Sequence, residues 1–141
     1  MNTAKKGEKI LLQKPGYFEL SATERRNIVD AFAKKGKTVK KSAFDLIHTN
    51  SKVNFSDKKD ITKKLSSITL IEIKSTKNNL DKKFSGHFFG ITENQEKLGK
   101  ILPNQCKFVF VNTKYKYILA LNYSQLLKRI KRKHMVAHVT I

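Results

Sequence analysis

Apolar residues along this chain recur in short blocks, and lysine-rich polar stretches separate the blocks. The first block with helical spacing follows a Ser-x-x-Glu capping box at Ser21 and Glu24 and ends before Gly36, a residue suited to a helix C-cap. This pattern predicts a helix over residues 22–35. The basic segment before it, residues 1–16, is expected to be a partly flexible N-terminal arm.

Extended segments follow this helix. Residues 68–74 are rich in β-branched side chains and give the clearest strand pattern. A second strand is expected over residues 43–47, an apolar segment with a single carboxylate, and a short one around Val39. Residues 49–66 are polar and lysine-rich, which indicates a long turn or an insertion. Residues 107–112 and 115–121 are expected to form a hairpin.

Two more helices are expected in the second half of the chain. Thr92 and Gln95 form a second capping-box pattern before a helix that Pro103 ends, and Ser124 can cap a last helix with a basic polar face. The order is helix, three strands, helix, two strands, helix. This order predicts a mixed α/β fold, in which a central mixed sheet is flanked by helices. We expect one domain over residues 17–141 after the arm.

The net charge of the chain indicates what kind of partner it binds. Thirty Lys and Arg face eleven Asp and Glu, for a formal net charge of +19. Such an excess opposes compaction by self-repulsion, and a polyanion, above all nucleic acid, is its natural partner. No apolar run approaches the ~20 residues of a membrane span, and the apolar stretch near the N-terminus is too short for a signal peptide. We therefore expect no membrane association.

Cysteine usage bears on the compartment. Cys106 is the one cysteine, so no internal disulfide can form, and a reducing, cytoplasmic or other intracellular location is expected. A compact lysine-rich protein would also suit a phage or a mobile element. Cys106 is more typical of a buried small apolar residue than of a nucleophile.

Candidate chemistry lies in the clearest strand. Alternation along a strand places Glu72 and Lys74 on one face and Ile71 and Ile73 on the other. A carboxylate and an ammonium in an apolar strand need a reason, because burial of either charge alone is costly. Metal-dependent phosphodiester hydrolysis supplies one, since two carboxylates can hold a divalent ion and a lysine can offset charge on the phosphate. Asp45 is the best second carboxylate if its strand pairs with that of Glu72.

These residues resemble the two half-motifs of the PD-(D/E)XK nuclease superfamily. The stretch Leu70-Ile-Glu-Ile-Lys-Ser-Thr76 is similar to its second half-motif, and Phe44-Asp45-Leu46-Ile47 is similar to its first. The expected element order also resembles the αβββαβ core of that restriction-endonuclease-like fold, over roughly residues 20–121. The match departs from the common pattern in having no proline before Asp45 and in a long gap between Asp45 and Glu72.

The resemblance implies a role for each residue. Asp45 and Glu72 would bind Mg²⁺ or Mn²⁺ together with the carbonyl oxygen of Ile73, and Lys74 would be the catalytic lysine. Members often add an acidic residue from the first helix, and Glu24 is the match here, although capping explains it equally well. No small-molecule cofactor is expected, because no nucleotide-binding motif is present.

Structural explanations stand beside these roles. Glu72 and Lys74 can be a cross-strand ion pair on a solvated face. Asp45 can be a strand-end or turn residue, and Asp57 or Asp60 can take its place as the second carboxylate.

Basic residues outside the motif are candidates for contacts with nucleic acid. Phosphate contacts of this kind position a protein without reading bases. Phe84, Phe88 and Phe89, which neighbour some of these residues, are more typical of a core, and the lysines and the basic tail can equally be solvated surfaces. The candidates are Lys82, Lys83, Ser85, His87, Lys128, Arg129, Lys131 and Arg132.

Two polar features remain. Gln95 lies on the helix that, in the resembled fold, packs beside the active site, and it can serve there or as a cap. His134 and His138 have the spacing of a helical metal pair, but no further ligand completes a zinc set, so a zinc site is rejected.

Together, the observations predict a metal-dependent endonuclease that cuts DNA, either duplex in the manner of restriction enzymes or branched in the manner of Holliday-junction resolvases. Either activity favours a homodimer, because two strands must be cut. A non-catalytic nucleic-acid-binding module is the main alternative, and a basic protein that binds RNA or a partner enzyme is another.

Overall fold

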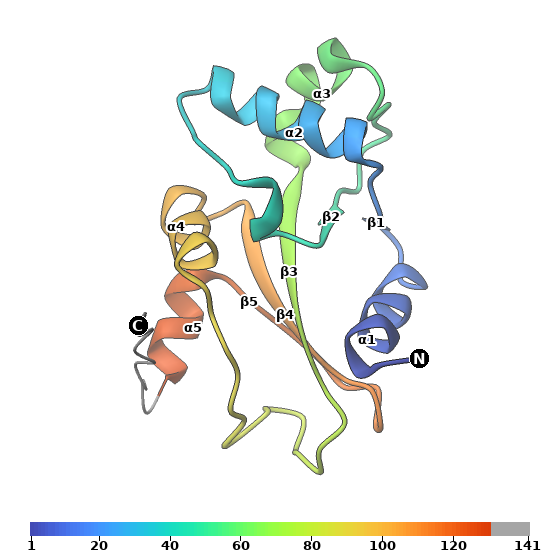
Figure 1. The fold of residues 1–141 in the computed structure, drawn as a ribbon, viewed down its shortest axis with the longest axis vertical. Helices are drawn as coiled ribbons and strands as arrows, with labels where there is room; N and C mark the ends of the chain where they lie inside the picture. The colour runs from blue at the N-terminus through green and yellow to red at the C-terminus, as the bar shows by residue number, and fades with distance from the viewer. Residues whose placement is uncertain (131–141) are drawn as a thin grey trace, which may run out of the picture.

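The computed structural model describes residues 1–130 and has a mixed α/β fold. A five-stranded sheet in the order β1-β2-β3-β4-β5 forms its centre, and helices pack against it (Figure 1). The strands are β1 (Tyr17–Phe18), β2 (Leu46–His48), β3 (Thr69–Thr76), β4 (Cys106–Asn112) and β5 (Ile118–Leu121). The helices are α1 (Thr3–Leu12), α2 (Ala22–Lys34), α3 (Lys58–Lys64), α4 (Glu93–Ile101) and α5 (Tyr123–Arg129), with 3-10 turns η1 (Lys41–Ala43) and η2 (Leu65–Ser67).

Strand directions in the sheet are mixed. β1, β2 and β3 are successively antiparallel, β3 and β4 are parallel, and β5 returns antiparallel to β4. Because parallel neighbours need a crossover, the segment between β3 and β4 contains helix α4. The register pairs Leu46 with Ile71 and Lys74 with Phe110. This register decides which side chains share a face beside β3.

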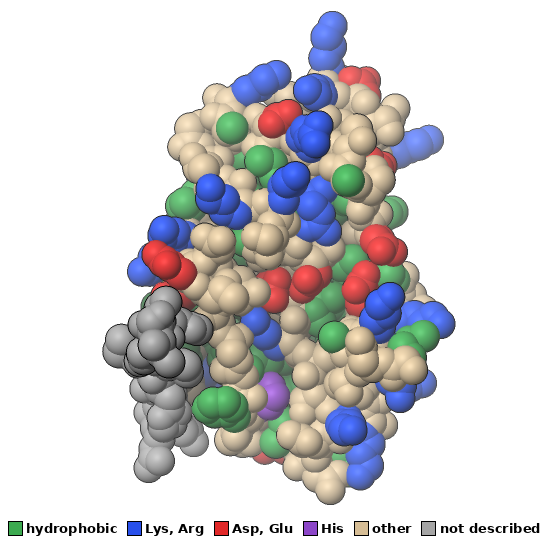
Figure 2. Space-filling view, viewed as in Figure 1, with side chains coloured by type: hydrophobic (Ala, Val, Ile, Leu, Met, Phe, Trp, Pro, Cys, Tyr) green, Lys and Arg blue, Asp and Glu red, His purple; other side chains and the backbone are tan. Residues whose placement is uncertain are grey.

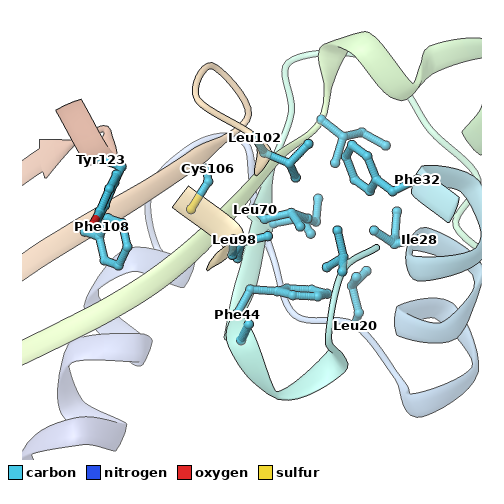
Figure 3. Packing of buried hydrophobic residues seen from close by; sticks show 14 of the residues in the cluster. Leu20, Ile28, Phe32, Phe44, Leu70, Leu98, Leu102, Cys106, Phe108 and Tyr123 are labelled. Atoms are coloured by element: carbon cyan, nitrogen blue, oxygen red, sulfur yellow. The ribbon is translucent and has the colours of Figure 1, made fainter. Parts of the chain in front are cut away.

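The two faces of the sheet bury separate apolar clusters. Ile47, Leu70 and Phe108 belong to the larger cluster, which α2, α4 and α5 cover; Figure 3 shows part of it. Ile71 belongs to the smaller cluster on the other face, where Leu11 of α1 is fully buried. Alternation along β3 puts Glu72 and Lys74 on the face of the larger cluster. The two charged residues therefore interrupt an otherwise apolar surface.

The N-terminal segment is a packed helix, and the expectation of a flexible arm was wrong. Asn2 caps α1 by accepting a hydrogen bond from the backbone N–H of Lys5 at 2.8 Å. Leu11 then fills the smaller cluster, and Gly7 lies against Ser75 of β3. The signal was present in the apolar run that includes Leu11, which the lysines around it obscured.

The helix expected at residues 22–35 is confirmed. Ser21 and Glu24 form the reciprocal capping box of α2, and Gly36 ends the helix with φ of +76°. The strand expected around Val39 was wrong, because Val39 is buried in irregular chain before η1. The strand expected over residues 43–47 begins only at Leu46, after η1.

The second half of the chain follows the sequence pattern more closely. The strands expected at 68–74, 107–112 and 115–121 correspond to β3, β4 and β5, and α4 begins at the predicted Thr92–Gln95 capping box. The last helix is capped by Asn122 in place of Ser124. Residues 49–66 contain α3, which was not expected. None of the helices in residues 1–130 is long and apolar enough to cross a bilayer.

Gly7 lets α1 approach the sheet, and we predict that Gly7→Ala destabilises the protein. A Cβ at this position would lie 1.9 Å from Oγ and 2.9 Å from Cβ of Ser75, so backbone must shift. We expect a loss of about 1–3 kcal/mol in the free energy of unfolding, despite the higher helix propensity of alanine. Urea unfolding followed by circular dichroism measures this loss.

Gly90 supplies the control, since a Cβ there would have no atom within 4 Å. Gly90→Ala should leave stability nearly unchanged, and Ser75→Gly should restore most of the stability that Gly7→Ala removes. Equal stability of the Gly7 and Gly90 variants would contradict close packing of α1 on β3.

Candidate active site

Asp45 lies at the point where the chain enters β2 and meets β3. Its backbone N–H donates to the carbonyl oxygen of Ile71 at 2.7 Å, which ties the residue before β2 to β3. Its Oδ2 accepts a hydrogen bond from the backbone N–H of Ile73 at 2.8 Å. The next residue, Leu46, is the register partner of Ile71, so Asp45 lies beside the part of β3 that carries Glu72. The carboxylate of Asp45 is thus fixed by main-chain atoms beside Glu72.

Arg25 of α2 holds the segment that carries Asp45. Its Nη1 donates to the carbonyl oxygens of Phe44 at 2.5 Å and Lys41 at 2.9 Å, and its Nη2 donates to that of Asp45 at 3.0 Å. The guanidinium also lies 4.5 Å from the centroid of the Phe44 ring. A planar fork of donors suits several carbonyls at once, which a lysine cannot match. Arg25 therefore connects the capped helix α2 to the backbone at Asp45.

Glu72, Lys74 and Gln95 form a closed hydrogen-bonded group on the α4 side of β3. Lys74 Nζ lies 3.3 Å from Oε1 of Glu72 and donates to Oε1 of Gln95 at 2.8 Å. Gln95 Nε2 donates to Oε1 of Glu72 at 2.7 Å. Glu72 is only 6% exposed, and the Lys74 side chain is turned toward the protein with 13% exposure. Gln95 is both the N3 residue of the α4 capping box and a member of this group.

The electrostatics of Glu72 reveal that a second carboxylate is close. The pKa of Glu72 is raised to about 8, first by burial and then by the negative charge of Asp45, while Lys74 acts in the opposite direction. A hydrogen bond with Asp45 contributes in the same direction as burial. Two carboxyl groups that share a site resist ionising together. The predicted convergence of Asp45 and Glu72 is therefore present.

Glu8 of α1 is an acidic residue that the sequence reasoning missed. Burial raises its pKa first, followed by the negative charges of Glu19 and Asp45. These electrostatic couplings place Glu8, Glu19 and Asp45 in one neighbourhood, and Glu72 adjoins it through Asp45. Figure 2 shows acidic side chains in a row across the middle of one face, with lysines and arginines around them. A helix predicted over residues 3–12 would have identified Glu8 as a candidate.

Glu24 forms the capping box that the sequence analysis gave as the alternative to a site role. It is the N3 residue of α2, and its Oε1 accepts a hydrogen bond from the backbone N–H of Ser21 at 2.9 Å. Asp57 caps α3, and Asp60 binds the backbone N–H of Asn54 and the ammonium of Lys64. These three carboxylates are engaged at helix ends and loops, so Asp45 holds the place of second carboxylate.

The donor set around Asp45 suits a hard divalent cation. Asp45 and Glu72 offer carboxylate oxygens, and the N–H and C=O of a strand residue point to the same side, so the Ile73 carbonyl faces the edge where Asp45 lies. Magnesium and manganese favour such oxygen ligands. Among residues 1–130, no group of three or more His, Cys, Asp and Glu side chains is arranged to hold a metal, so an ion at Asp45 and Glu72 would also need a main-chain oxygen and water as ligands.

The candidate nucleic-acid contacts in the segment after β3 are partly anchored by aromatic rings. The His87 ring lies 6.0 Å from that of Phe110, and burial lowers the pKa of His87. Lys82 and Lys83 are exposed, and the backbone N–H of Ser85 binds the Asp81 carboxylate at 3.1 Å. The expectation that Phe84 and Phe89 are core residues is confirmed, whereas Phe88 is 79% exposed.

The basic tail begins on α5. Lys128 and Arg129 are exposed in its last turn, and Arg129 donates to the carbonyl oxygen of Lys83. Lys131, Arg132 and the two tail histidines lie outside the described residues.

Cys106 is buried as expected. Burial, together with the charge of Glu72, raises the pKa of its thiol to about 12, which is unsuited to a nucleophile.

The chain has no detectable similarity to characterised proteins: no protein-family model, curated protein or solved structure matches it.

The raised pKa of Glu72 makes stability depend on pH. The unfolded chain loses this proton near the ordinary value of 4.5, and the folded chain keeps it to about 8. The contribution of the Glu72 carboxyl group to the free energy of unfolding is therefore fully present below pH 4.5 and is lost as the pH rises to 8. In EDTA, we expect the wild type to lose more unfolding free energy between about pH 5 and pH 8 than Glu72→Gln, which stays neutral.

Urea unfolding at several pH values in this range measures the difference. Glu24→Gln is the control, because Glu24 is a capping carboxylate for which a slope like the wild type's is expected. Equal slopes for the wild type and Glu72→Gln would contradict a buried, protonated Glu72.

Proposed function

We propose that this protein is a metal-dependent endonuclease of the PD-(D/E)XK type that hydrolyses phosphodiester bonds in DNA. One observation carries the proposal: the carboxylate of Asp45 lies close to that of Glu72, and Lys74 lies on the same face of β3 as Glu72. A structural ion pair needs one acid. A second acid, held by main-chain hydrogen bonds where it raises the pKa of the first, is a feature of sites that bind cations.

The element order supports the same proposal. α1, the antiparallel strands β1–β3, α4 and the parallel strand β4 reproduce the αβββαβ order of the resembled superfamily, with α2 and α3 as additions between strands. In this reading, the core helix is α1 and not the helix at residues 22–35. Glu8 then becomes the acidic residue from the first helix, in place of Glu24.

Each residue would have a defined role in hydrolysis. Asp45, Glu72 and the Ile73 carbonyl would hold Mg²⁺ or Mn²⁺. The ion, when bound, supplies a water of lowered pKa and polarises the phosphate. Lys74, with its ammonium held inside the site, offsets negative charge that develops on the phosphate. Ionisation of Glu72, which burial opposes, is favoured by a nearby cation.

Gln95 positions the two charged groups. Its amide oxygen accepts from Lys74 and its amide nitrogen donates to Glu72, so one side chain fixes both ends of the pair. Its own position is fixed by the capping box with Thr92 at the start of α4. Helix α4 thereby sets the orientation of the proposed catalytic lysine.

DNA is the proposed partner because the net charge of +19 favours a polyanion. A homodimer is proposed for cutting both strands. The second candidate is a non-catalytic nucleic-acid-binding module, and one observation favours it: Glu72 already has both Lys74 and Gln95 as partners. In that case the group would be a satisfied buried ion pair.

Cleavage assays separate the two candidates. We expect the wild type to cut supercoiled, linear or four-way-junction DNA with Mg²⁺ or Mn²⁺ and to be inactive in EDTA. Lys74→Ala should reduce the cleavage rate by roughly 100- to 1000-fold, the usual cost of removing one group that stabilises transition-state charge. Asp45→Asn and Glu72→Gln should abolish it while DNA binding persists.

Lys77 lies three residues after Lys74 and outside the hydrogen-bonded group, so Lys77→Ala is the matched lysine control and should cut normally. A wild-type protein that binds DNA but cuts none of the substrates with either metal would refute the nuclease and leave the binding module.

The acidic residue from the first helix can be identified with a matched pair. We expect Glu8→Gln to reduce cleavage by roughly 10- to 100-fold, the range seen when a residue that supports metal ligands is lost. Glu24→Gln should cut like the wild type and lose only part of its capping stability. The opposite ranking of the two variants would return the role to Glu24.

A further inference from the structure

The loop between β3 and α4, residues 77–92, is anchored beside the proposed site by aromatic rings. The rings of Phe84, His87 and Phe89 lie 5.9, 6.0 and 4.9 Å from the ring of Phe110. Phe110 is the register partner of Lys74 across the parallel pair β3–β4, and paired residues share a face. The β3–α4 loop therefore lies on the same face of the sheet as the proposed catalytic group, one strand away.

Phe88 stands between two of these anchored rings and faces outward. It is 79% exposed, more than any other large apolar side chain of the described residues. Its neighbours His87 and Phe89 stack on each other at 5.8 Å with an interplanar angle of 20°, which limits the directions that the backbone between them can take. An exposed aromatic ring in a loop that its neighbouring rings anchor to the sheet is typical of a binding surface.

The loop that carries Phe88 also carries two exposed lysines, Lys82 and Lys83. Lys82 lies 5.6 Å from the ring of Tyr117, and Lys83 is joined to α5 through the hydrogen bond that its carbonyl oxygen accepts from Arg129. Neither Lys82 nor Lys83 forms an ion pair within residues 1–130. A loop that carries both ammonium groups and an exposed aromatic ring matches the chemistry of single-stranded nucleic acid, which offers phosphates and base faces together.

We propose that Phe88 stacks on an unpaired base of the DNA substrate, while Lys82 and Lys83 contact the neighbouring phosphates. The proposal rests on the nuclease function above and deepens it. A base inside a continuous duplex is stacked on both faces and is not available to Phe88. The site therefore favours DNA with an unpaired or unstacked nucleotide near the cut, such as a bulge, a flap or a branch, over fully paired duplex.

Binding measured without cleavage tests this proposal independently of catalysis. The full chain is titrated in EDTA with a labelled duplex that contains one unpaired nucleotide and with the same duplex fully paired. We expect the wild type to bind the bulged DNA more tightly. Phe88→Ala should weaken that binding by roughly 5- to 150-fold, the range for loss of one stacked base. Phe88→Trp should preserve it, and Phe88→Leu should behave like Phe88→Ala.

Phe18 supplies a matched control, because it is an exposed phenylalanine on β1 with 42% exposure. Phe18→Ala should not change the preference for bulged DNA. Substitution of both Lys82 and Lys83 by alanine should reduce the salt dependence of binding by about two units of the log–log slope.

Crosslinking gives a direct readout of the contact. On irradiation, DNA with 5-iodouracil at the unpaired position should crosslink to Phe88. Peptide mass spectrometry can identify the crosslinked residue.

Equal affinity of the wild type for bulged and paired DNA, or an unchanged preference in Phe88→Ala, would overturn the stacking proposal even if the protein cuts DNA. Absence of cutting with a bulge preference that depends on Phe88 would instead refute the nuclease and leave the stacking surface intact.

Discussion

The structure depends on the proximity of two carboxylates, Asp45 and Glu72, where the chain enters β2 against β3. Glu72 is buried, and the charge of Asp45 adds to the cost of ionising it. The fold nevertheless fixes Asp45 with a main-chain hydrogen bond from Ile73 and fixes Glu72 with Lys74 and Gln95. The cation that we propose to bind both groups would explain why the fold holds two acidic side chains together at this cost.

The elements around this pair limit its movement. Arg25 binds three carbonyl oxygens of the segment that leads into β2 and so ties Asp45 to helix α2. On the other face of the sheet, Gly7 allows α1 to lie against Ser75, one residue after Lys74. That close approach also brings Glu8 near Asp45. Helices from both faces thus contribute to one edge of the sheet, although only β3 carries the Glu-x-Lys pattern.

The sequence predicted the parts of this site that local pattern determines. Alternation in β3 identified Glu72 and Lys74, and two capping boxes located the starts of α2 and α4. Asp45 could be proposed as a partner because it interrupts an apolar segment, although the strand begins one residue later.

Other features depended on tertiary packing and could not be read from the sequence. The α1 helix is stabilised by burial of Leu11 against the sheet, which a window of lysine-rich sequence does not reveal. Glu24 and Glu8 each lie in a helix, and only the packing of α1 distinguishes the acid near Asp45 from the capping acid. The exposure of Phe88 among buried aromatic neighbours likewise follows from the path of one loop.

The central claim is that Asp45 and Glu72 bind one divalent ion together, and a crystal grown with Mn²⁺ tests it most directly. Anomalous scattering locates manganese without assumptions about the ligands. We predict one ion in contact with both carboxylates and with the Ile73 carbonyl oxygen, and no ion there in Asp45→Asn crystals grown the same way. An empty site in the wild type, with Glu72 still bound to Lys74 and Gln95, would contradict the account.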